Sequence, residues 1–195
     1  MKKIIVGITG ASGSIYGKTI IQELVNLGHE VHLVVTKQGA LVLEHEIEPL
    51  SDMLKEILLN NSAHQIIVHD NQNLFSDIAS GSFKTDGMII APCSMGTLGK
   101  IAFGMSDHLL TRAADVMIKE KRPLILVTRE TPLSPIHLEN MLKLSRLGVT
   151  IFPPVPAFYN KPTTLDALVS DTVGRILETI DIKNRFHKIW SEPLE

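Results

Sequence analysis

The sequence predicts an α/β fold, a three-layer doubly wound (Rossmann-like) and mostly parallel six-stranded sheet with helices on both faces. Short apolar runs, typical of strands buried on both sides, alternate with segments of helical apolar spacing. Two strand-to-helix junctions, after residues 8 and 91, are rich in glycine and serine. Right-handed crossovers favour the strand order 3-2-1-4-5-6, with a binding site outside the carboxyl ends of strands 1 and 4.

The individual elements follow from periodicity and from residues that begin or end helices. Ser51 and Ser94 are expected N-caps, Pro123 stops a helix, and Gly28 and Gly148 end two others. The expected strands cover residues 4–8, 30–36, 65–68, 86–91, 124–128 and 149–152. The expected helices cover residues 14–27, 38–46, 51–59, 94–103, 107–121, 135–147 and 165–180.

Composition limits the class of protein. The 195 residues are enough for one domain, which we place at residues 1–181 with a C-terminal tail at 182–195. The net charge of −2 gives no indication of a broad basic surface that would bind nucleic acid. No apolar run approaches the ~18 residues of a membrane span. With a single cysteine and no leader-like N-terminus, the expected location is cytoplasmic.

The first junction, Gly7-Ile-Thr-Gly-Ala-Ser-Gly13, has the composition of a phosphate-binding turn. Its glycine spacing is not that of the dinucleotide fingerprint, and the second strand ends in Thr36 where an acidic residue would hold a ribose. The Gly17-Lys18-Thr19 triplet is a chance match to a triphosphate loop, since Ser12 stands where that loop needs its first glycine. A mononucleotide with one phosphate, held by Ser12, Thr36 and turn N–H groups, is favoured over a turn without a ligand.

Further candidates follow other strands. Arg129 and Glu130 stand at the end of the fifth strand, and Tyr159 follows a proline-stiffened loop. Cys93, at an apolar strand end with no histidine in fixed relation to it, is expected to be structural. The histidines do not have the spacing of a zinc site, and His29 and His32 are expected at the surface. No aspartate-rich segment is present to hold magnesium. We therefore expect no metal.

Several long motifs together resemble the UbiX-type flavin prenyltransferases. The resemblance runs from the first strand to the last helix. The motifs are Gly7-Ile-Thr-Gly-Ala-Ser-Gly13, Ala91-Pro-Cys-Ser-Met95, Leu109-Leu-Thr-Arg-Ala-Ala-Asp115, Lys121-Arg-Pro-Leu124, Arg129-Glu-Thr-Pro-Leu133 and Pro153-Pro-Val-Pro-Ala-Phe-Tyr159. The resemblance implies joining a dimethylallyl group from dimethylallyl monophosphate to N5 and C6 of reduced FMN, without a metal.

The resemblance also implies site residues, carried over by motif. Catalytic roles fall to Glu130, Glu46 and Lys119, and the dimethylallyl phosphate would be held by Tyr159, Arg175 and Arg112. FMN would be held by Gly10, Ala11, Ser12, Thr36, Ser94, Met95, Gly96, Thr97 and Arg129. Two positions depart from the family pattern. Thr36 replaces a frequent serine and keeps the hydroxyl, whereas Gly96 stands where some members have lysine.

The resemblance further implies partners, and two alternatives stay open beside it. The product would serve a UbiD-type decarboxylase, and the chain would form a homo-oligomer, a dodecamer as in the family. One alternative is an FMN-dependent cysteine decarboxylase, which would carry Pro-Ala-Ser-Ala-Asn where this chain has Ala91-Pro-Cys-Ser94. The other is a non-enzymatic flavin carrier, which would have no need for Arg129 and Glu130.

Overall fold

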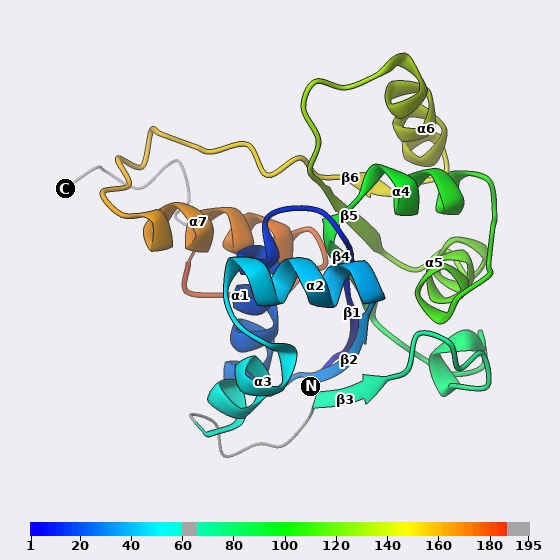
Figure 1. The fold of residues 1–195 in the computed structure, drawn as a ribbon, viewed down its shortest axis with the longest axis horizontal. Helices are drawn as coiled ribbons and strands as arrows, with labels where there is room; N and C mark the ends of the chain where they lie inside the picture. Colours follow the sequence, from blue (N-terminus) through cyan, green and yellow to red (C-terminus); the bar gives the residue numbers. More distant parts are fainter. Residues whose placement is uncertain (60–65, 187–195) are drawn as a thin grey trace.

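The computed structural model describes residues 1–59 and 66–186, and it contains a six-stranded parallel sheet in the order β3-β2-β1-β4-β5-β6 (Figure 1). The predicted fold class and strand order are confirmed. The strands are β1 (Lys3–Ile8), β2 (Glu30–Val35), β3 (Ile66–His69), β4 (Gly87–Cys93), β5 (Leu124–Thr128) and β6 (Thr150–Ile151).

Helices cover both faces of this sheet. On one face, α1 (Ser14–Asn26), α2 (Lys37–Glu46), α3 (Leu50–Leu59) and α7 (Leu165–Glu178) enclose a core with Ile4, Val6 and Ile8 of β1. On the other face, α4 (Met95–Ala102), α5 (Leu109–Lys119), α6 (Pro135–Arg146) and the 3₁₀ turn η1 (Asp77–Ala79) enclose a core with Ile5. Successive residues of β1 therefore point into opposite layers, as a strand buried on both faces requires.

Close approach of helices to the sheet explains two glycines. A Cβ on Gly17 would lie 2.5 Å from the carbonyl oxygen of Ala91, and a Cβ on Gly39 would lie 2.5 Å from that of Ile8. Helices α1 and α2 can therefore sit against β4 and β1 only because these two positions lack a side chain.

The boundaries of most elements differ from the prediction by one or two residues, most clearly at Ser51, at the start of α5 and in β6. Ser51 is not a cap, because α3 begins at Leu50 and the carbonyl of Pro49 already accepts hydrogen bonds from the first turn. Helix α5 begins at Leu109 rather than 107, since His108 has an extended backbone and is its N-cap. Strand β6 has two residues rather than four, and β5 is its partner at the sheet edge. Residue 65 of the expected third strand and residues 187–195 of the expected tail lie outside the described residues.

A buried histidine also corrects the sequence analysis. His32 is 2% exposed rather than at the surface. Its Nδ1 lies 2.9 Å from Nε2 of His69, and its Nε2 lies 2.8 Å from a carboxylate oxygen of Glu30. Nδ1 of His69 in turn lies 2.8 Å from Oγ of Ser76. These contacts tie the segment between β3 and β4 to the sheet.

Candidate functional site

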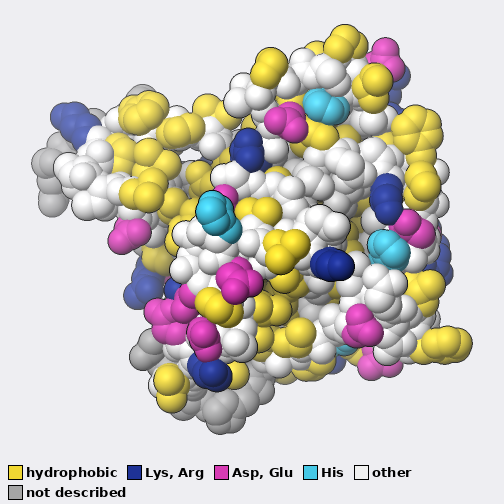
Figure 2. Space-filling view, in the orientation of Figure 1, with side chains coloured by type: hydrophobic (Ala, Val, Ile, Leu, Met, Phe, Trp, Pro, Cys, Tyr) yellow, Lys and Arg dark blue, Asp and Glu magenta, His cyan; other side chains and the backbone are white. Residues whose placement is uncertain are grey.

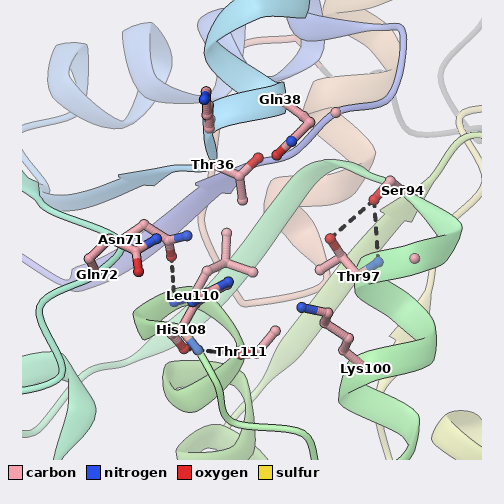
Figure 3. A pocket seen from close by; sticks show the side chains of 13 residues that line it. Thr36, Gln38, Asn71, Gln72, Ser94, Thr97, Lys100, His108, Leu110 and Thr111 are labelled. Atoms are coloured by element: carbon pink, nitrogen blue, oxygen red, sulfur yellow. Dashed lines mark hydrogen bonds between the residues drawn. The ribbon is translucent and has the colours of Figure 1, made fainter.

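A pocket of about 310 Å³ opens at the carboxyl edge of the sheet, where β1, β2 and β4 end (Figure 3). The N-terminal turns of α2, α4 and α5 all contribute to its wall. Its lining residues are Gly10, Thr36, Lys37, Gln38, Asn71, Gln72, Ser94, Gly96, Thr97, Lys100, His108, Leu110 and Thr111. Because the N-terminus of a helix carries a partial positive charge, three such ends around one space favour an anionic ligand.

The wall formed by α2 depends on the end of β2. Thr36 caps this helix, its hydroxyl oxygen accepting a hydrogen bond of 3.0 Å from the N–H of Gly39. Gly10 lies against this turn so closely that a Cβ on it would stand 2.6 Å from Cβ of Gln38. The loop after β1 and the start of α2 therefore meet at the pocket, and the hydroxyl proton of Thr36 remains available to donate.

The wall formed by α4 is fixed by a chain of hydroxyl groups. Ser94 caps α4, accepting from the N–H of Thr97 at 3.3 Å and donating to the Thr97 hydroxyl at 3.1 Å (Figure 3). The N–H of Ser94 donates to the hydroxyl of Thr9, and that hydroxyl donates to the carbonyl of Pro92, each at 2.8 Å. The predicted cap at Ser94 is confirmed, and the ends of β1 and β4 are linked beneath the pocket.

The wall formed by α5 is held by the segment after β3. The Asn71 carbonyl accepts from the N–H of Leu109, and its side-chain oxygen accepts from the N–H of Leu110, at 2.9 and 3.0 Å. Lys100 of α4 faces this wall and forms an ion pair of 2.6 Å with Asp107. Asn71 thus satisfies donors at the start of α5, as an N-terminal cap does.

The start of α1 accepts a carboxylate from the end of α2. The carboxylate of Glu46 accepts hydrogen bonds from the N–H groups of Gly13 and Ser14, at 3.0 and 2.8 Å. Burial acts to raise the pKa of Glu46, but hydrogen bonds from the Ser12 hydroxyl and from the Ser14 and Gly13 N–H groups outweigh it and hold this pKa below its ordinary value. These two N–H groups are therefore taken by Glu46 in this structure, and the binding of a phosphate by N–H groups of the turn stays a prediction.

Arg129, which follows β5, contacts the loop after β1. Its Nε donates to the carbonyl of Ser12 at 3.3 Å, and its N–H lies 3.4 Å from the carbonyl of Cys93. Arg129 therefore joins the ends of β1, β4 and β5 next to the pocket, with Glu130 following it at the surface.

Comparison with known proteins identifies the family. A family model described as Flavoprotein matches residues 1–183. The flavin prenyltransferase UbiX of Halalkalibacterium halodurans is 48% identical over 96% of this chain and 92% of its own length. The chain belongs to the flavin prenyltransferase family.

Two solved structures share the fold along almost the whole chain. AnUbiX (PadA1), crystallised with FMN and dimethylallyl pyrophosphate, superimposes with a TM-score of 0.91 at 40% identity, covering 99% of both chains. A dodecameric FMN-dependent UbiX-like decarboxylase from Escherichia coli O157:H7 gives a TM-score of 0.89 at 43% identity, covering 97% of this chain and all of the other.

In this flavin prenyltransferase, the structure brings together part of the predicted site. Five predicted FMN-binding residues line the pocket, namely Gly10, Thr36, Ser94, Gly96 and Thr97. The other four, Ala11, Ser12, Met95 and Arg129, lie beside it in the same loops or at the end of β5. Glu46 reaches the loop after β1 from the end of α2.

Four other predicted residues do not line the pocket. Arg112 and Lys119 lie on α5. Arg112 donates hydrogen bonds to the Ala79 carbonyl and the Asp115 carboxylate. Lys119 forms an ion pair with Glu120. Arg175 lies on α7, on the opposite face of the sheet, where it forms an ion pair of 2.6 Å with Glu178. Tyr159 is 43% exposed in the segment between β6 and α7, which has neither helix nor strand (Figure 1).

Sequence reasoning missed the remaining pocket residues. The missed residues are Lys37, Gln38, Asn71, Gln72, Lys100, His108, Leu110 and Thr111. Asn71 follows a predicted strand, and this position is a signal that could have found it. The expectation for Cys93 is confirmed: the thiol is fully buried, and burial raises its pKa, which disfavours the nucleophilic thiolate.

Proposed function

We propose that this chain transfers the dimethylallyl group of dimethylallyl monophosphate to N5 and C6 of reduced FMN, as a metal-independent flavin prenyltransferase. The observation that carries this proposal is the pocket formed by three helix N-termini beside Arg129 and Glu130. FMN supplies the nucleophilic ring atoms that accept the group. Everything else in the reaction falls to residues of the chain and to the phosphate that leaves.

The pocket residues fit the phosphate and ribityl part of FMN. The hydroxyls of Ser94 and Thr97 face the space from one wall, Thr36 lines it from a second, and the amide of Asn71 comes from a third (Figure 3). Helix N-termini favour the phosphate dianion, and hydroxyl and amide groups suit the ribityl hydroxyls. The pocket volume lies near the lower end of the range usual for small-molecule sites, which suits part of a ligand that extends beyond the pocket toward Arg129.

Arg129 and Glu130 suit the two charge movements of the transfer. The departing phosphate needs positive charge, which the Arg129 guanidinium supplies without a metal. The carboxylate of Glu130 accepts a hydrogen bond of 3.1 Å from the N–H of Thr131 and lies at the surface of this edge. We assign to Glu130 the relay of the proton lost from C6, shared with the released phosphate.

We also propose that copies of the chain complete the site in a homo-oligomer, a dodecamer. In one chain Lys119 and Arg175 lie on opposite faces of the sheet, so a single chain does not bring both to one ligand. Apolar side chains are exposed on α6 and on the segment before α7, both visible in Figure 2. Ile136 and Phe158 are 67% and 70% exposed, as expected for surfaces that pack against another copy.

Mass spectrometry tests the proposed reaction directly. Anaerobic incubation with reduced FMN and dimethylallyl monophosphate should give a flavin heavier by the dimethylallyl group, and the result should not change in EDTA. A flavin recovered with unchanged mass would contradict the proposal. The donor preference is tested in the same assay by dimethylallyl diphosphate, which should react more slowly.

A mixing experiment tests the shared site. Ser12→Ala and Arg175→Ala variants should each turn over slowly, and the two mixed under conditions that exchange subunits should recover part of the wild-type rate. No recovery after verified exchange would contradict a site built from several copies.

Two further parts of the proposal concern the setting of the reaction. We propose a UbiD-type decarboxylase as recipient of the product, which is tested by whether this chain's reaction mixture activates such an apoenzyme. Among the described residues, no helix is long and apolar enough to cross a membrane. A cytoplasmic location stays a prediction, as does the domain boundary at residue 181.

A further inference from the structure

Lys100 places a cation in the pocket that sequence reasoning did not foresee. It lies on the second turn of α4, one turn beyond Gly96, and both residues line the pocket. Figure 3 shows its ammonium group extending from α4 toward Leu110 and Thr111, below the Thr97 hydroxyl. Lys100 therefore stands on the same wall as the hydroxyl pair formed by Ser94 and Thr97.

An acidic partner orients this lysine from outside the pocket. The carboxylate of Asp107 lies 2.6 Å from Nζ of Lys100, and Asp107 is not among the residues that line the pocket. The Lys100 and Asp107 side chains are 38% and 41% exposed. The pair holds the flexible lysine stem in one direction, which lowers the entropy that Lys100 would lose on binding a ligand.

We propose that Lys100, positioned by Asp107, binds the phosphate group of FMN. This inference rests on the proposed function. A phosphate monoester carries close to two negative charges at neutral pH, more than the partial charge of a helix N-terminus can balance. Lys100 supplies a full charge beside the N-terminus of α4, whose cap Ser94 and third-position hydroxyl Thr97 face the same space. A mobile ammonium is also well suited to phosphate as a point charge.

Lys37, the other lysine of the pocket, is less suited to this role. It is exposed at the first position of α2, whereas Lys100 is partly buried and has an oriented ion pair. We therefore expect Lys37→Met to change FMN affinity less than Lys100→Met does.

The test compares FMN with riboflavin, which differs from FMN only by lacking the phosphate. Fluorescence titrations of the full chain should show that Lys100→Met raises the Kd for FMN about 10- to 100-fold, the range for loss of one hydrogen bond to a charged group. The Kd for riboflavin should not change. Lys55→Met is the matched control, since Lys55 forms a similar lysine–aspartate pair with Asp52 on α3 outside the pocket.

Two more variants separate phosphate binding from a structural role. Asp107→Asn breaks the same ion pair but keeps the cation, so it should raise the Kd for FMN less than Lys100→Met does. A Cβ on Gly96 would meet no atom within 4 Å, and positions 96 and 100 share one face of α4. Adding Gly96→Lys to Lys100→Met should therefore return the charge to the pocket and restore FMN affinity.

Several results would overturn this assignment. They are equal losses for FMN and riboflavin, no loss for either, or a loss in Asp107→Asn as large as in Lys100→Met. In each of these cases Lys100 would be a structural link between α4 and the turn before α5. Prenylation by Lys100→Met at saturating FMN would leave the proposed function intact, whereas failure of the wild-type chain to bind FMN would contradict the proposed function itself.

Discussion

Replacement of Glu46 by Gln should destabilise the loop after β1 in a pH-dependent way. The Glu46 carboxylate accepts N–H groups of Gly13 and Ser14 at the start of α1, which has no acidic residue in its first turn. Hydrogen bonds to charged groups contribute about 1.5–3 kcal/mol, and a charge at a helix N-terminus about 0.3–1 kcal/mol. Because Glu46 is exposed and the Gln oxygen can still accept, we expect a loss of about 1–2 kcal/mol at pH 7.

The sign of the pH dependence follows from the pKa of Glu46, which is lower in the folded state than its ordinary value. Its stabilisation is therefore present above the ordinary pKa of a glutamate and is lost as the pH falls through the lower folded value. Urea unfolding of both proteins from pH 7 to pH 3 measures this difference, which should shrink toward acid. Glu44→Gln, at an exposed position of the same helix, is the control. A pH-independent difference, or none, would show that the carboxylate does not anchor this loop.

Three further predictions concern catalysis, packing and protonation. Glu130→Gln should bind FMN and dimethylallyl monophosphate but turn over ~10²–10⁴-fold more slowly in stopped-flow assays, and a wild-type rate would exclude a proton relay. Gly17→Ala should lower the free energy of unfolding by about 1–3 kcal/mol because its Cβ would lie 2.5 Å from the Ala91 carbonyl, whereas Gly99→Ala, with only an ordinary contact at 3.7 Å, should not. Burial and a neighbouring histidine lower the pKa of His69, so stability should fall as the pH drops below the ordinary histidine pKa, and His69→Gln should flatten that curve in thermal melts.

The fold was predictable because its signals are local. Each buried strand is a short apolar run, and each crossover is long enough for a helix, so handedness leaves few arrangements. Both ends of strand β5 (Leu124–Thr128) were predicted correctly, because Pro123 precedes the strand and polar residues follow it. The two-residue strand β6 was predicted too long, since an edge strand ends where pairing with its neighbour ends, and this depends on β5 rather than on its own sequence.

Of the residues that line the pocket, only those in the loops after β1 and β4 and at the end of β2 could be predicted from the sequence. Glycine and serine after an apolar run identified Gly10 and Ser94, but Asn71 lies at the pocket through contacts with the distant start of α5. The pairing of Lys100 with Asp107 depends on the turn between α4 and α5. Asn71 acts on the N-terminus of α5, 39 positions away in sequence, and no spacing rule connects the two. Glu46 was assigned to the site by resemblance, yet its hydrogen bonds to the start of α1 became visible only when α2 was placed beside that loop.

The residues assigned to the prenyl phosphate could not be placed around one ligand from the sequence of a single chain. Their motifs imply one shared ligand, but a single fold places Lys119 at the end of α5 and Arg175 on α7, across the sheet from each other. The ion pairs of Lys119 with Glu120 and of Arg175 with Glu178 hold both side chains locally in one chain. If both cations act on one phosphate, different copies of the chain must supply them, and the same motif then serves the site of a neighbour. The reaction would therefore require assembly, because an isolated chain would retain the FMN pocket but not the full set of cations that ionise the allylic phosphate.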